Sequence, residues 1–350
     1  MIITALVVVG VLVLGGGALG GYAWNNSTYA ARDLQAALHA GFVEHSTTVP
    51  SGTVLNYAEG PDNGPAVLLI HAQTSSWESY ARALPALAAD FHVYAIDVAG
   101  HGDSARTPGR YTVHDIGQDV VDFLTDTIAD TVILSGHSSG GLIAAWVAAE
   151  APELVEAVLL EDPPLFSTEA ARMPQQFNYI DLAQPAHEFL ASDETDFAAY
   201  YLANNAWIGH FGQGKDGIVR YAADYRAAHP DEPLNLWFLP PVSNESYAHM
   251  HEFDPAFADA FYDLSWQADF DQAATLAAIT QPSILVHADW RITDDGILEG
   301  AMTDDVAALA CNTLVDCSLV RVQTGHGYHF EDPDGFVGLI EQLNSELSGA

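Results

Sequence analysis

Short, almost wholly apolar runs alternate with amphipathic stretches along most of this chain of 350 residues, and this alternation constrains its fold more than any other feature. Residues 66–71 form such a run, which is typical of a strand buried on both faces of a parallel sheet. An amphipathic stretch at 77–89 follows it and is typical of a helix. The order then repeats, with strands predicted at 92–97, 131–135 and 155–161 and helices at 114–128 and 139–150. We therefore expect an α/β fold with an open, mostly parallel sheet and right-handed crossovers.

This series is preceded by a hairpin and contains one long interruption. Residues 42–49 and 54–59 are β-rich and are joined by a Pro-Ser-Gly turn, which indicates a hairpin. After residue 164 the pattern stops, and it resumes with a strand at 283–288, a helix at 304–311, a strand at 318–322 and a helix at 333–347. Residues 165–270 are therefore predicted to be a largely helical cap inserted after the sixth strand, with 20 of the 36 aromatic residues. Such a cap would cover the carboxyl edge of the sheet, where open α/β sheets bind ligands.

The N-terminal segment carries no charged side chain between Ile2 and Trp24. A helix of this length just crosses the roughly 30 Å hydrocarbon core of a bilayer. Small residues at 18–20 also offer a cleavage site, so an anchor and a signal peptide both fit; we favour an uncleaved anchor. A polar stretch at 25–28 then leads into a helix predicted at 29–39. The predicted division is a membrane or signal segment at 1–24, a core at 25–164 and 271–350, and the cap at 165–270.

The charge of the chain is strongly one-sided, with 10 Lys and Arg against 47 Asp and Glu and a net charge of −37. Nucleic acid is excluded as a partner because phosphate binding needs clustered cations. Carboxylates without partners repel one another, and salt weakens this repulsion, so we interpret the charge as adaptation to a salty environment; a very acidic secreted protein is the alternative. We expect a monomer outside the cytoplasm, membrane-anchored or secreted, whose only membrane contact is the N-terminal segment.

The two cysteines, Cys311 and Cys317, are too few for a structural zinc site or a disulfide framework. They lie six residues apart, which allows one small disulfide loop in an oxidising compartment. The sequence leaves both the bonded and the free state open.

A candidate nucleophile lies where the strand at 131–135 turns into the helix at 139–150. Residues 136–140 read Gly-His-Ser-Ser-Gly and match the G-x-S-x-G pattern in its proper strand, turn and helix context. The small flanking residues allow a sharp turn that holds the Ser138 hydroxyl above the sheet at a helix N-terminus. We therefore expect Ser138 to be the nucleophile.

On this turn, and on residues 69–73 leading to Trp77, residues 97–104 and residues 160–164, the chain resembles the α/β-hydrolase superfamily. It is most similar to capped bacterial members with a serine nucleophile and an N-terminal membrane segment. The resemblance covers about residues 42–347 and implies an α/β-hydrolase fold with esterase-type hydrolysis. It also implies the chain order nucleophile, acid, histidine.

The base is expected late in the chain, because a serine hydroxyl is a poor nucleophile until a neighbouring base takes its proton. His326 lies in a Gly-His-Gly loop between the last strand and the last helix, where the family's histidine lies. We therefore assign the base to His326 and a structural role to His71, His101 and His329.

The acid is less clearly marked. The family usually carries it in a G-x-x-D turn after the seventh strand, but residues 288–291 read Ala-Asp-Trp-Arg, so Arg291 stands at the expected place. Asp289, and further along Asp294 and Asp295, are shifted candidates. Some superfamily members place the acid after the sixth strand, where Asp162 precedes two prolines that would fix its backbone. We favour Asp162, with Asp289 as the alternative acid and a turn cap as the alternative role of Asp162.

Two backbone N–H groups should bind the oxyanion formed by attack, that of Ser139 and, by the resemblance, that of Gln73. No phosphate-binding or dinucleotide fingerprint occurs, and His249 and His251 lack a third ligand, so we expect neither cofactor nor metal. Aromatic residues suggest an apolar substrate group, and the candidate substrate-binding residues are Trp77, Trp207, Phe211 and Trp237, with Phe238 nearby.

The sequence thus predicts a serine hydrolase with a small-molecule substrate, a carboxylic ester or related acyl compound, which it cleaves through an acyl-enzyme. A serine at the elbow disfavours alkyl-enzyme chemistry, which needs a carboxylate nucleophile. Hydrolysis of a C–C bond or an amide by the same triad remains an alternative. A non-catalytic surface binding protein on a hydrolase scaffold is another, because fold alone does not entail activity.

Overall fold

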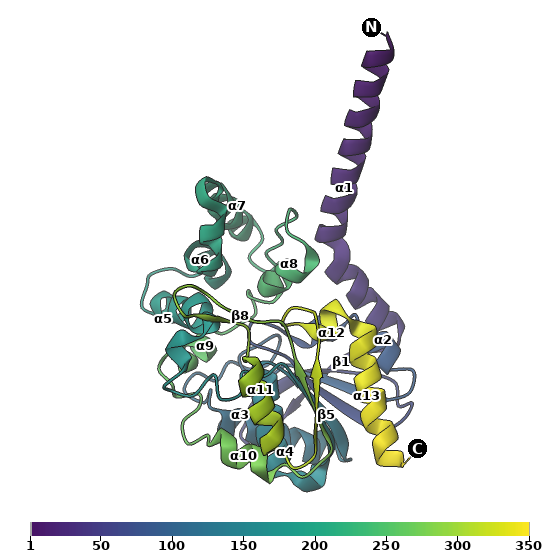
Figure 1. The fold of residues 1–350 in the computed structure, drawn as a ribbon, viewed down its shortest axis with the longest axis vertical. Coiled ribbons are helices and arrows are strands. Elements are labelled where there is room, and N and C mark those ends of the chain that lie inside the picture. The colour runs from purple at the N-terminus through teal and green to yellow at the C-terminus, as the bar shows by residue number, and fades with distance from the viewer. Residues whose placement is uncertain (1, 350) are drawn as a thin grey trace.

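A single eight-stranded sheet organises the computed structural model, which describes the backbone of residues 2–349 and the side chains of residues 17–349 (Figure 1). In their order across the sheet the strands are β1 (Val43–Thr48), β2 (Val54–Glu59), β4 (His92–Ile96), β3 (Ala66–Ile70), β5 (Val132–His137), β6 (Val155–Glu161), β7 (Ser283–His287) and β10 (Cys317–Arg321). β1 and β2 form the predicted antiparallel hairpin, and β2 is antiparallel to β4. The strands from β4 to β10 are all parallel, which confirms the predicted sheet.

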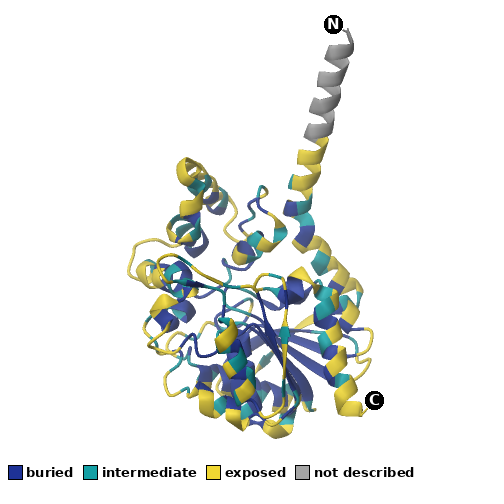
Figure 2. Cartoon of the chain, viewed as in Figure 1, coloured by how far each residue is buried: buried dark blue, intermediate teal, exposed yellow. Residues whose placement is uncertain are grey.

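The central strands are buried on both faces, as their continuous apolar runs predict (Figure 2). In β3, Leu68 and Ile70 pack on the side of helices α3 (Val113–Phe123) and α4 (Ser139–Glu150). Val67 and Leu69 pack on the other side, with helices α2 (Leu84–Leu87) and α13 (Pro333–Ser348). Each fully buried aliphatic side chain of this kind contributes about 1.5–3 kcal/mol relative to exposure.

Two local elements differ from the sequence-based expectation. The single helix predicted at 77–89 is instead a 3₁₀ turn, Trp77–Tyr80, followed by the short α2. Pro85 lies in the first turn of α2, where a proline is accepted, but it has no N–H to continue an earlier helix. After β7 the chain forms an unexpected small hairpin of β8 (Arg291–Ile292) and β9 (Leu298–Glu299), followed by α11 (Asp304–Thr313). The disulfide Cys311–Cys317 then links α11 to β10.

The cap region between β6 and α10 (Gln272–Ala278) contains helices and turns and no strand among its described residues. Its helices are α5 (Gln184–Leu190), α6 (Phe197–Asn204), α7 (Lys215–Ala228), α8 (Pro241–Ala248) and α9 (Pro255–Tyr262). In Figure 1 they gather at one end of the sheet, the end from which α1 (Ile2–His39) also projects.

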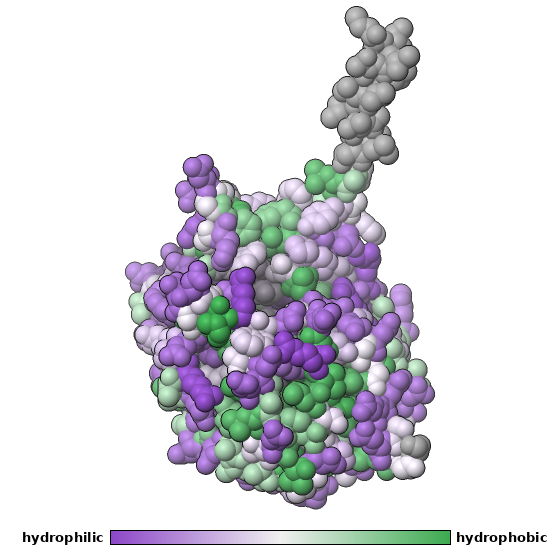
Figure 3. All heavy atoms as spheres, viewed as in Figure 1, coloured by the Kyte–Doolittle hydropathy of each residue, from purple (hydrophilic) through white to green (hydrophobic). Residues whose placement is uncertain are grey.

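Helix α1 is continuous, so the polar stretch at 25–28 is helical and not a linker. The reason is that the cap satisfies its polar groups: Asn26 is buried, and its Nδ2 donates to the carbonyl of Trp237 at 3.1 Å. The Tyr22 hydroxyl donates to the carbonyl of Phe238 in the same way. Figure 3 shows apolar residues gathered where the described part of α1 meets the rest of the molecule.

The predicted membrane segment at 1–24 falls largely on residues 1–16, whose side chains lie outside the described part of the chain. Among the described residues, no helix has the length and apolar character needed to cross a bilayer.

Candidate active site

Ser138 occupies a strained turn between β5 and α4, with φ 54° and ψ −117°. The close approach of neighbouring backbone explains the glycines around it. A Cβ atom at Gly136 would collide with the carbonyl oxygen of Gly140, and one at Gly140 would collide with the carbonyls of Ile70 and His71. The local sequence thus allows a backbone that few residues tolerate, and strain of this kind is typical of functional sites.

His326 and Asp162 form a hydrogen-bonded pair near Ser138. Asp162 directly follows β6, and His326 lies between β10 and α12 (Tyr328–Glu331). The Nδ1–H of His326 donates to Oδ2 of Asp162 at 2.7 Å. The Asp162 side chain is 2% exposed, whereas that of His326 is 45% exposed and lines the same cavity as Ser138. No hydrogen bond joins the Ser138 hydroxyl to His326 in the described part of the chain; such bonds often tighten only when substrate binds.

The environment of Asp162 keeps it ionised. Burial alone would raise the pKa of Asp162, but the nearby His287, His326 and the Ala288 backbone N–H lower it to about 2. Its Oδ1 accepts from that N–H at 3.1 Å and lies 3.6 Å from Nδ1 of His287. Desolvation lowers the pKa of His326, but the hydrogen bond and charge of Asp162 more than offset this and raise it above its ordinary value.

The two predicted oxyanion donors are free. The N–H of Ser139 begins α4, and Gln73 lies in the loop after β3 and lines the cavity. Among the described residues, neither of these N–H groups donates a hydrogen bond to the protein. Thr74, the next residue of the loop, has φ 60°, so this loop is also held in an uncommon conformation.

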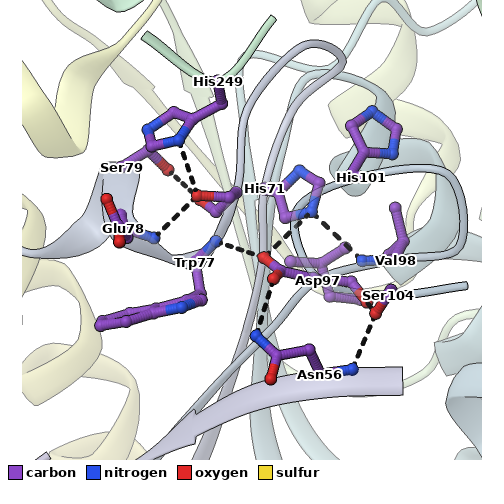
Figure 4. Close-up of polar contacts among 12 residues, drawn as sticks. Asn56, His71, Trp77, Glu78, Ser79, Asp97, Val98, His101, Ser104 and His249 are labelled. Carbon is purple, nitrogen blue, oxygen red and sulfur yellow. Dashed lines mark hydrogen bonds and ion pairs between the residues drawn. The ribbon is translucent and has the colours of Figure 1, made fainter. Parts of the chain in front are cut away.

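A buried polar network supports the loop after β3 (Figure 4). Nδ1 of His71 donates to the Ala72 carbonyl at 2.7 Å, and its Nε2 accepts from the Val98 N–H at 3.2 Å. Burial lowers the pKa of His71 to about 4, so the ring is neutral, as this donor and acceptor pattern requires. Asp97 fixes the far end of the loop by accepting from the Trp77 N–H at 2.7 Å. This network positions the loop, whose residue Ala72 lines the cavity.

Ser138, His326 and Gln73 line one cavity of about 430 Å³. Its floor is formed by the loops that carry Ser138 and His326, and its walls include the 300–301 segment after the β8–β9 hairpin. The cap contributes residues that sequence reasoning did not identify, including Met173, Gln176, Phe177, Asp181, Leu182 and Tyr201. The sequence offers one indication that such residues line the cavity: most of them follow Asp162 closely, and a chain leaving β6 must first pass over the site.

The four predicted substrate-binding aromatics are not among the residues that line this cavity. Trp77 is buried in the core, with its Nε1 donating to Glu44 at 2.9 Å. Trp207 and Phe211 pack against each other within the cap, with ring centroids 4.9 Å apart, and Trp237 is 40% exposed. Of the four, Trp207 and Phe211 therefore pack within the cap, whereas Trp77 packs in the core of the sheet domain.

The alternative acids lie apart from His326. Asp289 is exposed, and its N–H donates to the Thr324 carbonyl; Asp294 and Asp295 are exposed in the turn between β8 and β9. None of the three forms an ion pair with a histidine among the described residues. Arg291 pairs with Glu299 across the β8–β9 hairpin.

A family model described as the alpha/beta hydrolase fold matches residues 65–333, and the chain belongs to this family. It is a hydrolase-fold protein related to serine hydrolase-like proteins and epoxide hydrolases. It is 30% identical over 138 residues to the human "Serine hydrolase-like protein", a match covering 39% of this chain and 68% of the relative. It is 32% identical over 182 residues to the Mus musculus "Bifunctional epoxide hydrolase 2", a match covering 45% of this chain but only 33% of that protein.

Solved structures resemble the chain more completely, at identities that show the fold alone. A bacterial membrane phospholipase A matches with a TM-score of 0.60 and 21% identity, covering 100% of both chains. A hydrolase from Pseudomonas aeruginosa PA01 matches with a TM-score of 0.61 and 20% identity, covering 88% of this chain and 98% of that one.

Proposed function

We propose that this protein is a serine hydrolase that cleaves uncharged carboxylic esters through an acyl-enzyme. One observation carries the proposal: His326, which is hydrogen-bonded to Asp162, lines the same cavity as Ser138. The two free N–H groups beside that cavity support it. A binding protein without catalysis would not need this combination.

The proposed reaction follows from the roles of these groups. His326 Nε2 takes the proton of Ser138 as its oxygen attacks the ester carbonyl, and Asp162 stabilises the imidazolium that forms. The N–H groups of Gln73 and Ser139 bind the oxyanion, each contributing about 3 kcal/mol of barrier reduction. The imidazolium then protonates the leaving alcohol. Water, deprotonated by His326, releases the acid in the second half of the cycle.

Opening of an epoxide through an alkyl-enzyme is not proposed, although epoxide hydrolases are among the relatives. That route needs a carboxylate nucleophile, and the elbow of this chain carries Ser138.

The charge of the cavity indicates which esters it accepts. Asp181, Glu245 and Glu331 line it, and none of its described lining residues is Lys or Arg. A substrate carboxylate would find no Lys or Arg among these residues to pair with and would face the acidic groups in a partly desolvated site. We therefore propose an uncharged acyl group of moderate size, lodged against Met173, Leu182 and neighbouring cap residues.

Two assays test these proposals on the full chain. A fluorophosphonate probe should label the wild-type protein at Ser138, and Ser138→Ala should abolish labelling and turnover of p-nitrophenyl butyrate. An unlabelled, inactive wild-type protein would refute the serine hydrolase. For the charge preference, kcat/KM for p-nitrophenyl butyrate should exceed that for p-nitrophenyl hemisuccinate, of nearly equal length, by at least tenfold; equal values would refute it.

The membrane location stays a proposal. The uncharged residues between Ile2 and Trp24 support it, as does the similarity to a structure described as a membrane phospholipase A. Flotation of the full chain with neutral phosphatidylcholine vesicles should succeed, and recovery of the protein only from the lipid-free fraction would refute an anchor.

A further inference from the structure

A second group of buried ionisable side chains lies next to the proposed triad, and two of its members, His137 and His329, also line the cavity. His137 and Glu161 immediately precede the nucleophile and the acid in the chain, and His329 follows the base by three residues. One side-chain nitrogen or oxygen atom from each residue lies within 4.8 Å of the corresponding atoms of the other two, and all three residues are buried. The reaction proposed above uses none of them.

Hydrogen bonds from this group hold both ends of the short segment from His326 to His329. Oε1 of Glu161 accepts from the His329 backbone N–H at 3.0 Å and from its ring Nδ1–H at 2.7 Å. Nε2 of His137 lies 2.8 Å from the His326 carbonyl, and since a carbonyl can only accept, this nitrogen carries a proton. Side chains from the ends of β5 and β6 thereby fix the backbone that carries the proposed base.

Aromatic packing keeps the His329 ring in this orientation. Its centroid lies 4.3 Å from that of Tyr80 and 5.9 Å from that of Phe336. The His137 ring meets it edge-on at 5.0 Å. With neighbours on these sides, rotation of the ring away from Glu161 would require repacking of the core.

The same three residues could be suspected of binding a metal ion, but their geometry is that of a hydrogen-bonded network. Two ligands of one tetrahedral zinc ion stand about 3.3 Å apart, given metal–ligand distances of about 2.0–2.1 Å. The Glu161 oxygen and the His329 nitrogen are 2.7 Å apart, which is a hydrogen-bond distance.

We propose that Glu161 and His329 are positioning residues for His326. They hold the loop in the register that places the His326 ring between Asp162 and Ser138, and the negative charge of Glu161 stabilises the imidazolium formed during attack. This inference rests on the proposed role of His326 as the base.

The electrostatics of the site agree with this arrangement. Burial would raise the pKa of Glu161, but His329 and His137 lower it below its ordinary value, so it is a carboxylate. Its charge is among the causes that raise the pKa of His326, after those from Asp162. Besides Asp162, the titratable groups near Glu161 and His326 include His137 on β5, His287 on β7, Tyr80 in the 77–80 turn, and Tyr328, His329 and Glu331 on α12. Glu245 on α8 and His71 after β3 interact with His329.

The decisive variant is Glu161→Gln, which keeps an oxygen acceptor for both His329 donors and removes the charge. We expect kcat for p-nitrophenyl butyrate to fall roughly tenfold with little change in KM. The acidic limb of the pH profile of kcat/KM should move to lower pH by about half to one unit, because imidazolium loses a stabilising charge. A role in folding alone would not move this limb.

A pair of variants at His329 tests the positioning itself. His329→Asn can place an amide N–H where Nδ1–H lies and should retain most of the kcat, whereas His329→Leu should lose it. The matched control is Asp119→Asn, the same change at a buried carboxylate that binds Ser51 and Arg110 away from the cavity, and it should leave the kcat and the pH limb unchanged.

The outcomes are separable from those of the proposed function. If wild-type protein turns over the ester and Glu161→Gln matches it in kcat and pH limb, the positioning role is refuted and the serine hydrolase stands. If wild-type protein is inactive, the His326 pKa is read from the imidazole signals by NMR, assigned with His326→Gln. An unchanged His326 pKa in Glu161→Gln then overturns the inference, as would stoichiometric zinc in the purified protein.

Discussion

Replacing Asp162 with Asn removes one negative charge from the proposed triad while keeping the size and shape of the side chain. In the structure Oδ2 of Asp162 accepts from Nδ1–H of His326 at 2.7 Å, and Oδ1 accepts from the Ala288 N–H at 3.1 Å. Asn has one oxygen to serve these two donors. If that oxygen stays with Ala288, the amide N–H₂ faces His326 and favours the tautomer with its proton on Nε2. In that tautomer His326 cannot accept the proton of Ser138.

The size of the effect follows from two losses. A hydrogen bond to a charged group contributes about 1.5–3 kcal/mol, which is roughly 10- to 100-fold in rate if it acts only in the transition state. The wrong tautomer removes the base from most molecules, and in other enzymes the two losses together cost about 10⁴-fold. We expect kcat/KM of Asp162→Asn to fall about 10³- to 10⁴-fold.

The assay is hydrolysis of p-nitrophenyl butyrate at neutral pH, with Asp289→Asn as the matched control. Asp289 is exposed and its carboxylate makes no contact with His326, so its variant should stay within about twofold of wild type. Circular dichroism would establish that both variants fold. A larger loss in Asp289→Asn than in Asp162→Asn would show that the acid follows β7 and would refute the assignment.

Three further predictions concern the elbow, the base and the charge. Gly140→Ala should lower the free energy of unfolding by about 1–3 kcal/mol, because the added Cβ would collide with the Ile70 and His71 carbonyls. Gly338→Ala, on the open face of α13, should leave the free energy of unfolding unchanged, and denaturant titration of both variants measures the difference. Activity should fall about tenfold per pH unit below the His326 pKa, which is raised above 6.5, and a limb centred below pH 6.5 would contradict this. Raising KCl from about 0.1 M to about 2 M should raise Tm by several degrees by screening the net charge of −37, and a lower Tm would refute adaptation to salt.

Much of the core fold could be predicted because strands buried on both faces have a distinctive sequence. Every residue of β3 and β7 is buried, and such runs stand out in any window. The short elements are harder to predict from the sequence. Pro85 splits an amphipathic stretch that looks continuous by periodicity, and the two-residue strands β8 and β9 are too short to leave a pattern. The continuity of α1 through Asn26 depends on contacts with residues more than 200 positions away, which no local pattern reports.

The candidate site could likewise be predicted only in part. The placement of Ser138 and His326 on one cavity could be predicted because glycines and strand ends mark the places where a backbone must turn toward a site. The cavity wall could not be predicted, because helical cap residues face inward or outward according to how the cap packs. Aromatic character therefore pointed to Trp207 and Phe211, which contact each other, while Asp181 and Tyr201 form a buried hydrogen bond beside the cavity.

The position of the proposed acid is related to the geometry of the neighbouring strands β6 and β7. They are parallel, with Glu161 opposite Val286, so their carboxyl ends lie at the same edge about 4.8 Å apart. A histidine arriving from the end of β10 can meet a carboxylate at either end. In this chain the segment after β7 continues into the β8–β9 hairpin, whose Arg291 pairs with Glu299, and then forms cavity wall at Gly300. The carboxylate that His326 contacts is that of Asp162, at the end of β6, so Arg291 at the family's usual acid position is compatible with the proposed triad.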